Sequence, residues 1–247
     1  MRYLVLTDIH ANLEALDACL ADAHARRYEQ ALVLGDLVGY GADPNAVVDR
    51  VLGLDPVAIV RGNHDKVALG LAEAEAFNAV AKKAAEWTLS TLTPSHREWL
   101  AALPQGPHIV DALVEICHGS PFDEDAYIFD ELDALKAITT SSRQLCLFGH
   151  THYPATFELS NGTFNALLPS GAAERRLSLQ NGTKYLVNPG SVGQPRDGDP
   201  RAAYAIVDTT TRQVELIRLA YPVEAAQAKV IGAGLPEVLA RRLAAGR

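Results

Sequence analysis

The apolar residues of this chain follow two different rhythms, and the first of them governs the N-terminal quarter. Short apolar runs at 3–6, 31–34 and 57–60 alternate with stretches in which apolar residues recur at helical spacing. Such runs are typical of buried strands, and the stretches between them are typical of amphipathic helices. The order strand, helix, strand, helix, strand predicts an α/β arrangement, with polar groups at the carboxyl ends of the strands.

Helices are predicted from local start signals and from periodicity. Asn12 is expected to cap the first helix, and Asp43 with Pro44 to begin the second. The alanine-rich segment 66–104 is predicted to be helical, with a restart at Thr93-Pro94. We interpret it as an insertion beside the functional site, although extra packing scaffold is an equal alternative. A last amphipathic helix is predicted over 235–245.

The second rhythm begins after residue 104 and is dominated by strands. The dipeptides Asn161-Gly162 and Asn181-Gly182 each lie between apolar runs, which predicts a tight hairpin at both places. Segment 188–200 has too many turn residues for a regular element, and we interpret it as a functional loop. Strands are predicted at 108–110, 113–117, 145–148, 185–187, 203–208 and 213–219, with a helix at 129–138.

Composition changes this picture mainly by exclusion. The 247 residues, 48% hydrophobic and 21% charged, suit one soluble domain over 1–247 with the insertion inside it. No membrane-spanning run or signal-peptide pattern is visible, so we expect a cytoplasmic protein. The net charge of −8 argues against nucleic acid or an anionic membrane as a partner. The odd count of three cysteines predicts reduced core thiols.

The chemistry gathers where the predicted strands end. The run 145–148 stops at Gly149, and His150 and His152 follow two residues apart. In extended backbone such a pair points to one side, so both imidazoles are expected to aim at a single point. Asp8 and His10 repeat this spacing after the first strand. The pattern indicates a metal site, although two surface histidines would look the same.

Five strand ends together supply more ligand groups than one metal ion needs. Glycines flank four of these ends and let the backbone turn tightly and approach a ligand. Carboxylate, amide and imidazole groups without thiolate suit Mn²⁺, Fe, Zn²⁺, Co²⁺ or Ni²⁺. The residues are Asp8, His10, Asp36, Asn63, His64, His118, His150 and His152. A site for two metal ions, bridged by one aspartate, accounts for them economically.

In this order, these motifs resemble the calcineurin-like metallophosphoesterase family. The resemblance rests on Asp8-x-His10, Gly35-Asp36, Gly62-Asn63-His64-Asp65, His118 and Gly149-His150-Thr151-His152, and it spans most of the chain. It implies a four-layer αββα sandwich of two mixed sheets flanked by helices. It also implies that Asp8, His10, Asp36 and His152 hold one metal ion. Asp36, as the bridge, would hold the other with Asn63, His118 and His150.

This resemblance leads to a hydrolytic mechanism. Two divalent cations, with Mn²⁺ as the first expectation, would lower the pKa of a bridging water and supply hydroxide for in-line attack at phosphorus. His64 is placed to protonate the leaving alkoxide or to stabilise the transition state; a structural loop histidine is the alternative. The expected partner is a small phosphoester, and a phosphodiester is favoured. The alternatives are a nucleotide or dinucleoside-polyphosphate phosphatase and a non-catalytic scaffold that binds metal and a protein partner.

One departure from the family pattern bears on the substrate. Protein phosphatases of this superfamily have Asp-Arg-Gly where this chain has Gly39-Tyr40-Gly41. The histidine therefore lacks an aspartate partner and the phosphate lacks that guanidinium group, which favours the small bacterial and archaeal phosphodiesterase-like members. We expect Arg196 to replace the missing arginine. Tyr40 is expected either to stack on a substrate group or to cover the turn.

Overall fold

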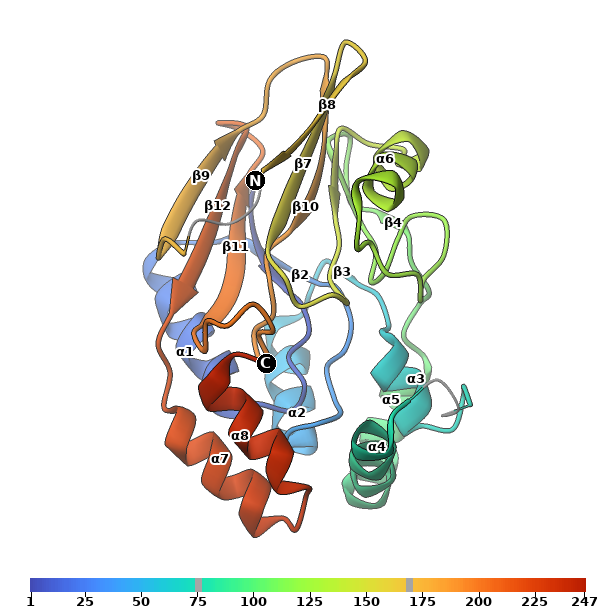
Figure 1. The fold of residues 1–247 in the computed structure, drawn as a ribbon, viewed down its shortest axis with the longest axis vertical. Helices are drawn as coiled ribbons and strands as arrows, with labels where there is room; N and C mark the ends of the chain where they lie inside the picture. The colour runs from blue at the N-terminus through green and yellow to red at the C-terminus, as the bar shows by residue number, and fades with distance from the viewer. Residues whose placement is uncertain (74–76, 168–170) are drawn as a thin grey trace.

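The architecture consists of two six-stranded sheets packed face to face (Figure 1). The structure is a computed structural model, and it describes residues 1–73, 77–167 and 171–247. The first sheet has the order β3 (Ala58–Ile59), β2 (Gln30–Val33), β1 (Arg2–Leu6), β11 (Ala202–Asp208), β12 (Gln213–Leu219), β9 (Glu174–Ser178). The second has the order β4 (His108–Ile109), β5 (Val114–Ile116), β6 (Leu145–Leu147), β10 (Thr183–Asn188), β7 (Ala155–Ser160), β8 (Thr163–Leu167). Both sheets combine parallel and antiparallel pairs.

Alternation along the strands creates the layers. In β1, Leu4 and Leu6 pack toward the helices, whereas Tyr3 and Val5 pack into the space between the sheets. That inner core also receives side chains of β5, β6 and β10. The far side of the second sheet packs against α6 (Glu131–Thr140). The predicted four-layer αββα fold is therefore confirmed.

The remaining helices lie mainly around the first sheet and the lower half of the molecule (Figure 1). They are α1 (Leu13–Ala25), α2 (Pro44–Leu54), α3 (Asn63–Ala68), α4 (Ala79–Thr91), α5 (Pro94–Ala101), α7 (Val223–Gly232) and α8 (Glu237–Ala245). Asn12 caps α1 as predicted, because its side chain accepts a hydrogen bond from the Ala15 amide. Among the described residues, no helix is both long and apolar enough to cross a lipid bilayer.

Several predicted elements are confirmed, and some need correction. Asn161-Gly162 does join a hairpin, β7 with β8. Asn181-Gly182 does not, because β9 pairs with β12 in one sheet while β10 pairs with β6 and β7 in the other. The turn therefore carries the chain between sheets. The helix predicted over 235–245 begins only at Glu237, since Pro236 occupies its N-cap, and α7 before it was not predicted.

Candidate metal centre

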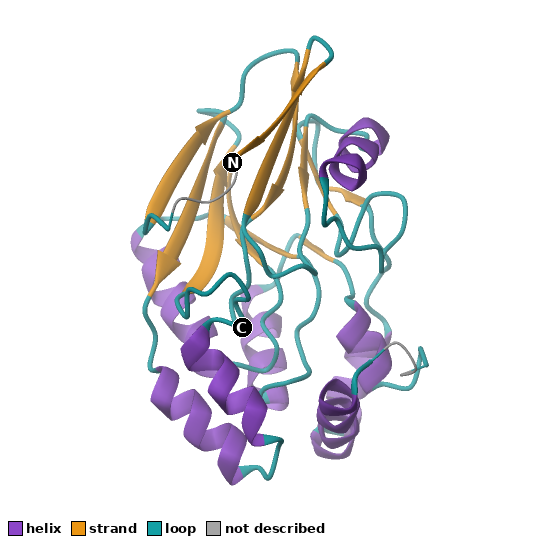
Figure 2. Cartoon of the chain, viewed as in Figure 1, coloured by secondary structure: helices purple, strands orange, loops and turns teal. Residues whose placement is uncertain are grey.

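All seven candidate ligands come from loops that follow strands, or from the helix start after β3. Asp8 and His10 follow β1, and Asp36 follows β2. Asn63 is the first residue of α3, just after β3. The other three are His118, which follows β5, and His150 and His152, which follow β6. These loops lie between the sheets and the lower helices (Figure 2).

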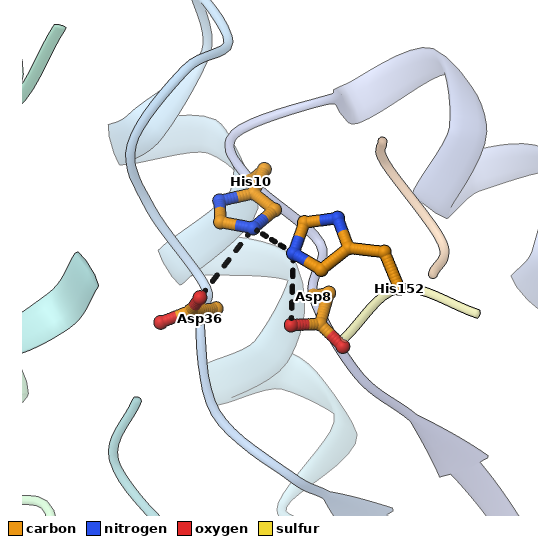
Figure 3. A group of neighbouring side chains, drawn as sticks. All are labelled: Asp8, His10, Asp36 and His152. Atoms are coloured by element: carbon orange, nitrogen blue, oxygen red, sulfur yellow. Dashed lines mark hydrogen bonds and ion pairs between the residues drawn. The ribbon is translucent and has the colours of Figure 1, made fainter. Parts of the chain in front are cut away.

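One group of candidate ligands lies around the Asp36 carboxylate and includes Asp8 and His10, which follow β1. Nε2 of His10 lies 3.5 Å from Oδ2 of Asp36 and 3.1 Å from Nε2 of His152. Nε2 of His152 lies 3.3 Å from Oδ1 of Asp8 (Figure 3). One potential ligand atom from each of the four residues lies within 4.8 Å of the other three. All four side chains are buried.

A second group shares Asp36 with the first. Nε2 of His118 lies 3.5 Å from Oδ2 of Asp36 and 3.1 Å from Nδ1 of His150. Oδ1 of Asn63 lies 3.2 Å from the same His118 nitrogen. The structure thus brings the seven residues into two adjacent groups, with Asp36 common to both.

The backbone explains why two histidines of one motif separate. The extended-backbone spacing predicts that His150 and His152 aim at one point. Instead β6 ends at Leu147, and both residues have positive φ angles of 66° and 61°. The chain therefore curls, and the two imidazoles enter different groups. Asp8, His10 and Asp36 also have positive φ, between 50° and 53°. Non-glycine residues rarely adopt this region, and it costs about 1–3 kcal/mol each where tertiary contacts enforce it.

The arrangement of donors fits a bound cation. Oδ2 of Asp36 is buried and has no hydrogen-bond partner. Each of four imidazoles uses one ring nitrogen to donate to a backbone carbonyl, which leaves its other nitrogen as a lone pair facing the group. These donors and acceptors are His10 with Val38, His118 with Leu34, His150 with Asp125, and His152 with Gln194. Lone pairs 3.1 Å apart repel each other unless a positive charge lies nearby, and a divalent cation supplies it.

Burial sets the protonation of these groups. It raises the pKa of Asp8 to about 7, an effect that His118 and the hydrogen bond from Thr7 partly offset. Burial and the nearby Asp65 carboxylate raise the pKa of Asp36 well above its usual range. Burial also lowers the pKa of four histidines well below the ordinary value: His10, His64, His150 and His152. Neutral imidazoles beside carboxylates that lack a counter-charge are what a metal ion stabilises.

Two polar residues outside the ligand set brace the loops. The Asp65 carboxylate is buried and accepts hydrogen bonds from the amides of Leu37 at 2.9 Å, Val38 at 3.2 Å and Gly62 at 2.9 Å. It therefore ties the Asp36 loop to the start of α3. In segment 188–200, Asn188 donates from its amide group to the Gly149 carbonyl at 2.8 Å. Segment 188–200, which was predicted to be a functional loop, thus supports the loop that carries His150 and His152.

Glycine is required where these loops touch. A Cβ atom on Gly62 would lie 2.1 Å from Oδ1 of Asp36. One on Gly149 would lie 2.0 Å from the Thr7 hydroxyl oxygen and 2.7 Å from Oδ2 of Asp8. Any side chain at either position would displace a candidate ligand, which gives a steric reason for both glycines.

His64 lies beside both groups without belonging to either. Its ring contacts the rings of His10, Tyr40 and Phe77, with centroids 4.8, 4.3 and 4.4 Å away. Its Nδ1 is buried without a hydrogen-bond partner, and a Cβ on Gly39 would lie 2.7 Å from that nitrogen. The His64 side chain thus leaves no room for a side chain at residue 39. Tyr40 is largely buried, and its ring contacts the rings of His10 and His64.

A cleft of about 690 Å³ opens next to Asn63 and His64. Arg196 lines it and donates hydrogen bonds to the Tyr40 hydroxyl at 3.3 Å and to Oε1 of Gln194 at 3.4 Å. Sequence reasoning missed eight other residues of its wall, because none of them belongs to a motif. Five of these have aromatic or charged side chains: Phe77, Tyr127, Tyr153, Arg242 and Arg247.

Comparison with known proteins agrees with this geometry. Residues 1–212 match the Calcineurin-like phosphoesterase superfamily domain. The chain is 35% identical over 245 residues to an uncharacterized protein from Methanocaldococcus jannaschii, covering 98% of this chain and 97% of that protein. A solved metallophosphoesterase from Sphaerobacter thermophilus is 39% identical with a TM-score of 0.87, covering 100% and 99% of the two chains. A hypothetical protein from Pyrococcus horikoshii OT3 shares the fold at 21% identity and a TM-score of 0.79, covering 100% and 98%. The chain therefore belongs to the calcineurin-like phosphoesterase superfamily and is a metal-dependent phosphoesterase.

Proposed function

We propose that this protein is a phosphodiesterase with a centre for two divalent metal ions. The proposal rests on one observation: two ligand groups share the Asp36 carboxylate and adjoin a cleft large enough for both ester substituents. Asp8, His10, Asp36 and His152 would hold one ion. Asp36, Asn63, His118 and His150 would hold the other. When bound, such ions acidify a coordinated water and neutralise charge on phosphoryl oxygens.

The chain's own residues would orient the substrate and stabilise its leaving group. His64 adjoins the ligand Asn63 and also lines the cleft, so its neutral imidazole can donate a hydrogen bond to a leaving-group oxygen. Arg196 would bind a non-bridging phosphate oxygen, since it is the cation that adjoins Tyr40 and His64 from the cleft side. Tyr40 would hold the guanidinium group in place through its hydroxyl. Mn²⁺ is the first metal to test, because the nitrogen and oxygen ligands suit it.

A diester is favoured over a monoester because of the space around the metal groups. A phosphomonoester needs room for one organic substituent, and its dianion needs more positive charge at the phosphate. The cleft volume is in the range of pockets that enclose drug-sized ligands. This chain has no arginine at the position of the Asp-Arg-Gly motif. Arg196, which bonds to the Tyr40 hydroxyl, is therefore the guanidinium group that would bind the phosphate.

The test compares two chromogenic substrates on protein that has been chelated and reloaded with Mn²⁺. Bis(p-nitrophenyl) phosphate is expected to turn over faster than p-nitrophenyl phosphate. His64→Ala should lower kcat by about 10²–10³-fold, the usual range for losing one hydrogen-bond donor to the transition state. His24→Ala, at an exposed position of α1, is the matched control and should behave like the wild type.

Each other result has a definite meaning. Faster hydrolysis of the monoester would replace the proposal with a phosphatase, for which nucleotides are the next substrates to test. Undiminished turnover by His64→Ala would remove that residue from the mechanism. Arg196→Ala with unchanged KM and kcat would remove Arg196 from the site.

A further inference from the structure

The charge of the cleft is opposite to that of the whole chain. The protein has a net charge of −8. Yet among the described residues that line the cleft, the permanently charged side chains are all arginines: Arg196, Arg242 and Arg247. Clefts lined by one sign of charge concentrate ligands of the opposite sign. Arg196 adjoins the metal groups through Tyr40, which leaves Arg242 and Arg247 as further guanidinium groups in the same cleft.

Two of these arginines reach the cleft from different segments. Arg196 bonds to the Tyr40 hydroxyl, and the Tyr40 ring in turn contacts His10 and His64. Arg242 lies on α8 and lines the same cleft. Arg196 is therefore the arginine beside the metal groups, and Arg242 is a second cation in the cleft.

The helix that carries Arg242 packs against the segments that carry Arg196 and Tyr40. Gly198, two residues after Arg196, donates its amide hydrogen to the Gly246 carbonyl at the end of α8. Tyr40 packs in one apolar cluster with Leu239 and Ala240 of α8. Arg242 is half-buried on this helix. These contacts hold the helix backbone that carries Arg242 in place beside the cleft.

We propose that Arg242 forms a second anion subsite, which binds a phosphate group other than the one hydrolysed. This inference rests on the proposed function, because it takes the first phosphate to lie at the metal groups. The ligand class is a nucleotide-like phosphoester with two separated phosphates. Tyr153 lines the same cleft, is 47% exposed, and provides an aromatic face for a base.

The test measures binding rather than turnover, so that a failure to hydrolyse diesters does not affect it. Calorimetry on Mn²⁺-loaded protein compares adenosine 5′-monophosphate with adenosine 3′,5′-bisphosphate, which differ by one phosphate. The wild type should bind the bisphosphate about tenfold more tightly, the gain typical of one charge-assisted contact. Arg242→Ala should abolish most of this ratio, and Arg242→Lys should keep part of it because the positive charge remains.

Arg241 offers a matched control at the neighbouring position. Its side chain is 73% exposed, pairs with Glu237 and is not part of the cleft. Arg241→Ala removes the same charge from the same helix and should leave the ratio as in the wild type. The proposal is overturned if the wild type does not distinguish the two nucleotides. It is also overturned if Arg242→Ala keeps the ratio, or if Arg241→Ala lowers it equally.

Discussion

Asp65 belongs to the sequence motif of the centre, yet its geometry predicts a purely structural role. Its carboxylate lies at the junction of two loops and accepts three backbone hydrogen bonds at 2.9, 3.2 and 2.9 Å. Asp65→Ala would leave three buried amides without their acceptor. We therefore expect the variant to be destabilised even in metal-free protein, where ligand loss plays no part.

The magnitude follows from these contacts. A buried donor without a partner costs about 1–3 kcal/mol, so the three amides set an upper range of about 3–9 kcal/mol. Two effects reduce it. Water can enter the vacated space, and the substitution relieves a carboxylate whose pKa burial has raised. We expect a net loss of about 3–4 kcal/mol, which for a chain of this size lowers the Tm by about 6–16 °C.

The assay is urea unfolding of chelated protein, followed by circular dichroism. Asp17→Ala is the control, because Asp17 is an exposed aspartate paired with Arg50 on the surface, and such pairs contribute about 0–1 kcal/mol. If Asp65→Ala unfolded within about 0.5 kcal/mol of the wild type, the bracing argument would be wrong. Wild-type stability combined with lost metal binding would instead make Asp65 a ligand.

Three further outcomes are expected. Chelation should lower the Tm and Mn²⁺ should restore it, since an ion at a hundredfold its Kd adds about 2.7 kcal/mol; mass spectrometry should find two ions per chain, and an unchanged Tm would contradict the centre. Gly62→Ala should reduce metal content, because the added Cβ would displace Asp36. The control is Gly53→Ala, whose Cβ would meet open space and which should unfold no earlier than the wild type. Arg218→Ala should cost about 3–5 kcal/mol by stranding the Asp197 carboxylate, and denaturant midpoints within experimental error would refute this.

The sequence by itself determined the parts of this protein that local rules control. The helix start at Asn12, the hairpin at Asn161-Gly162 and the layers of the β1 side chains follow from capping, turn chemistry and alternation. These effects act between residues close in the chain. The ligand candidates could be identified for a similar reason, because each follows an apolar run and lies in a short motif.

Tertiary structure decided how those residues meet. His150 and His152 separate into two groups because packed loops enforce positive φ angles that no extended pattern predicts. The strand β9 pairs with β12 in the first sheet, although the Asn181-Gly182 turn beside it predicted a hairpin with the next strand. Arg242 and Tyr127 reach one cleft from segments more than a hundred residues apart. Such contacts depend on the summed packing of distant elements, whose free energies no local pattern contains.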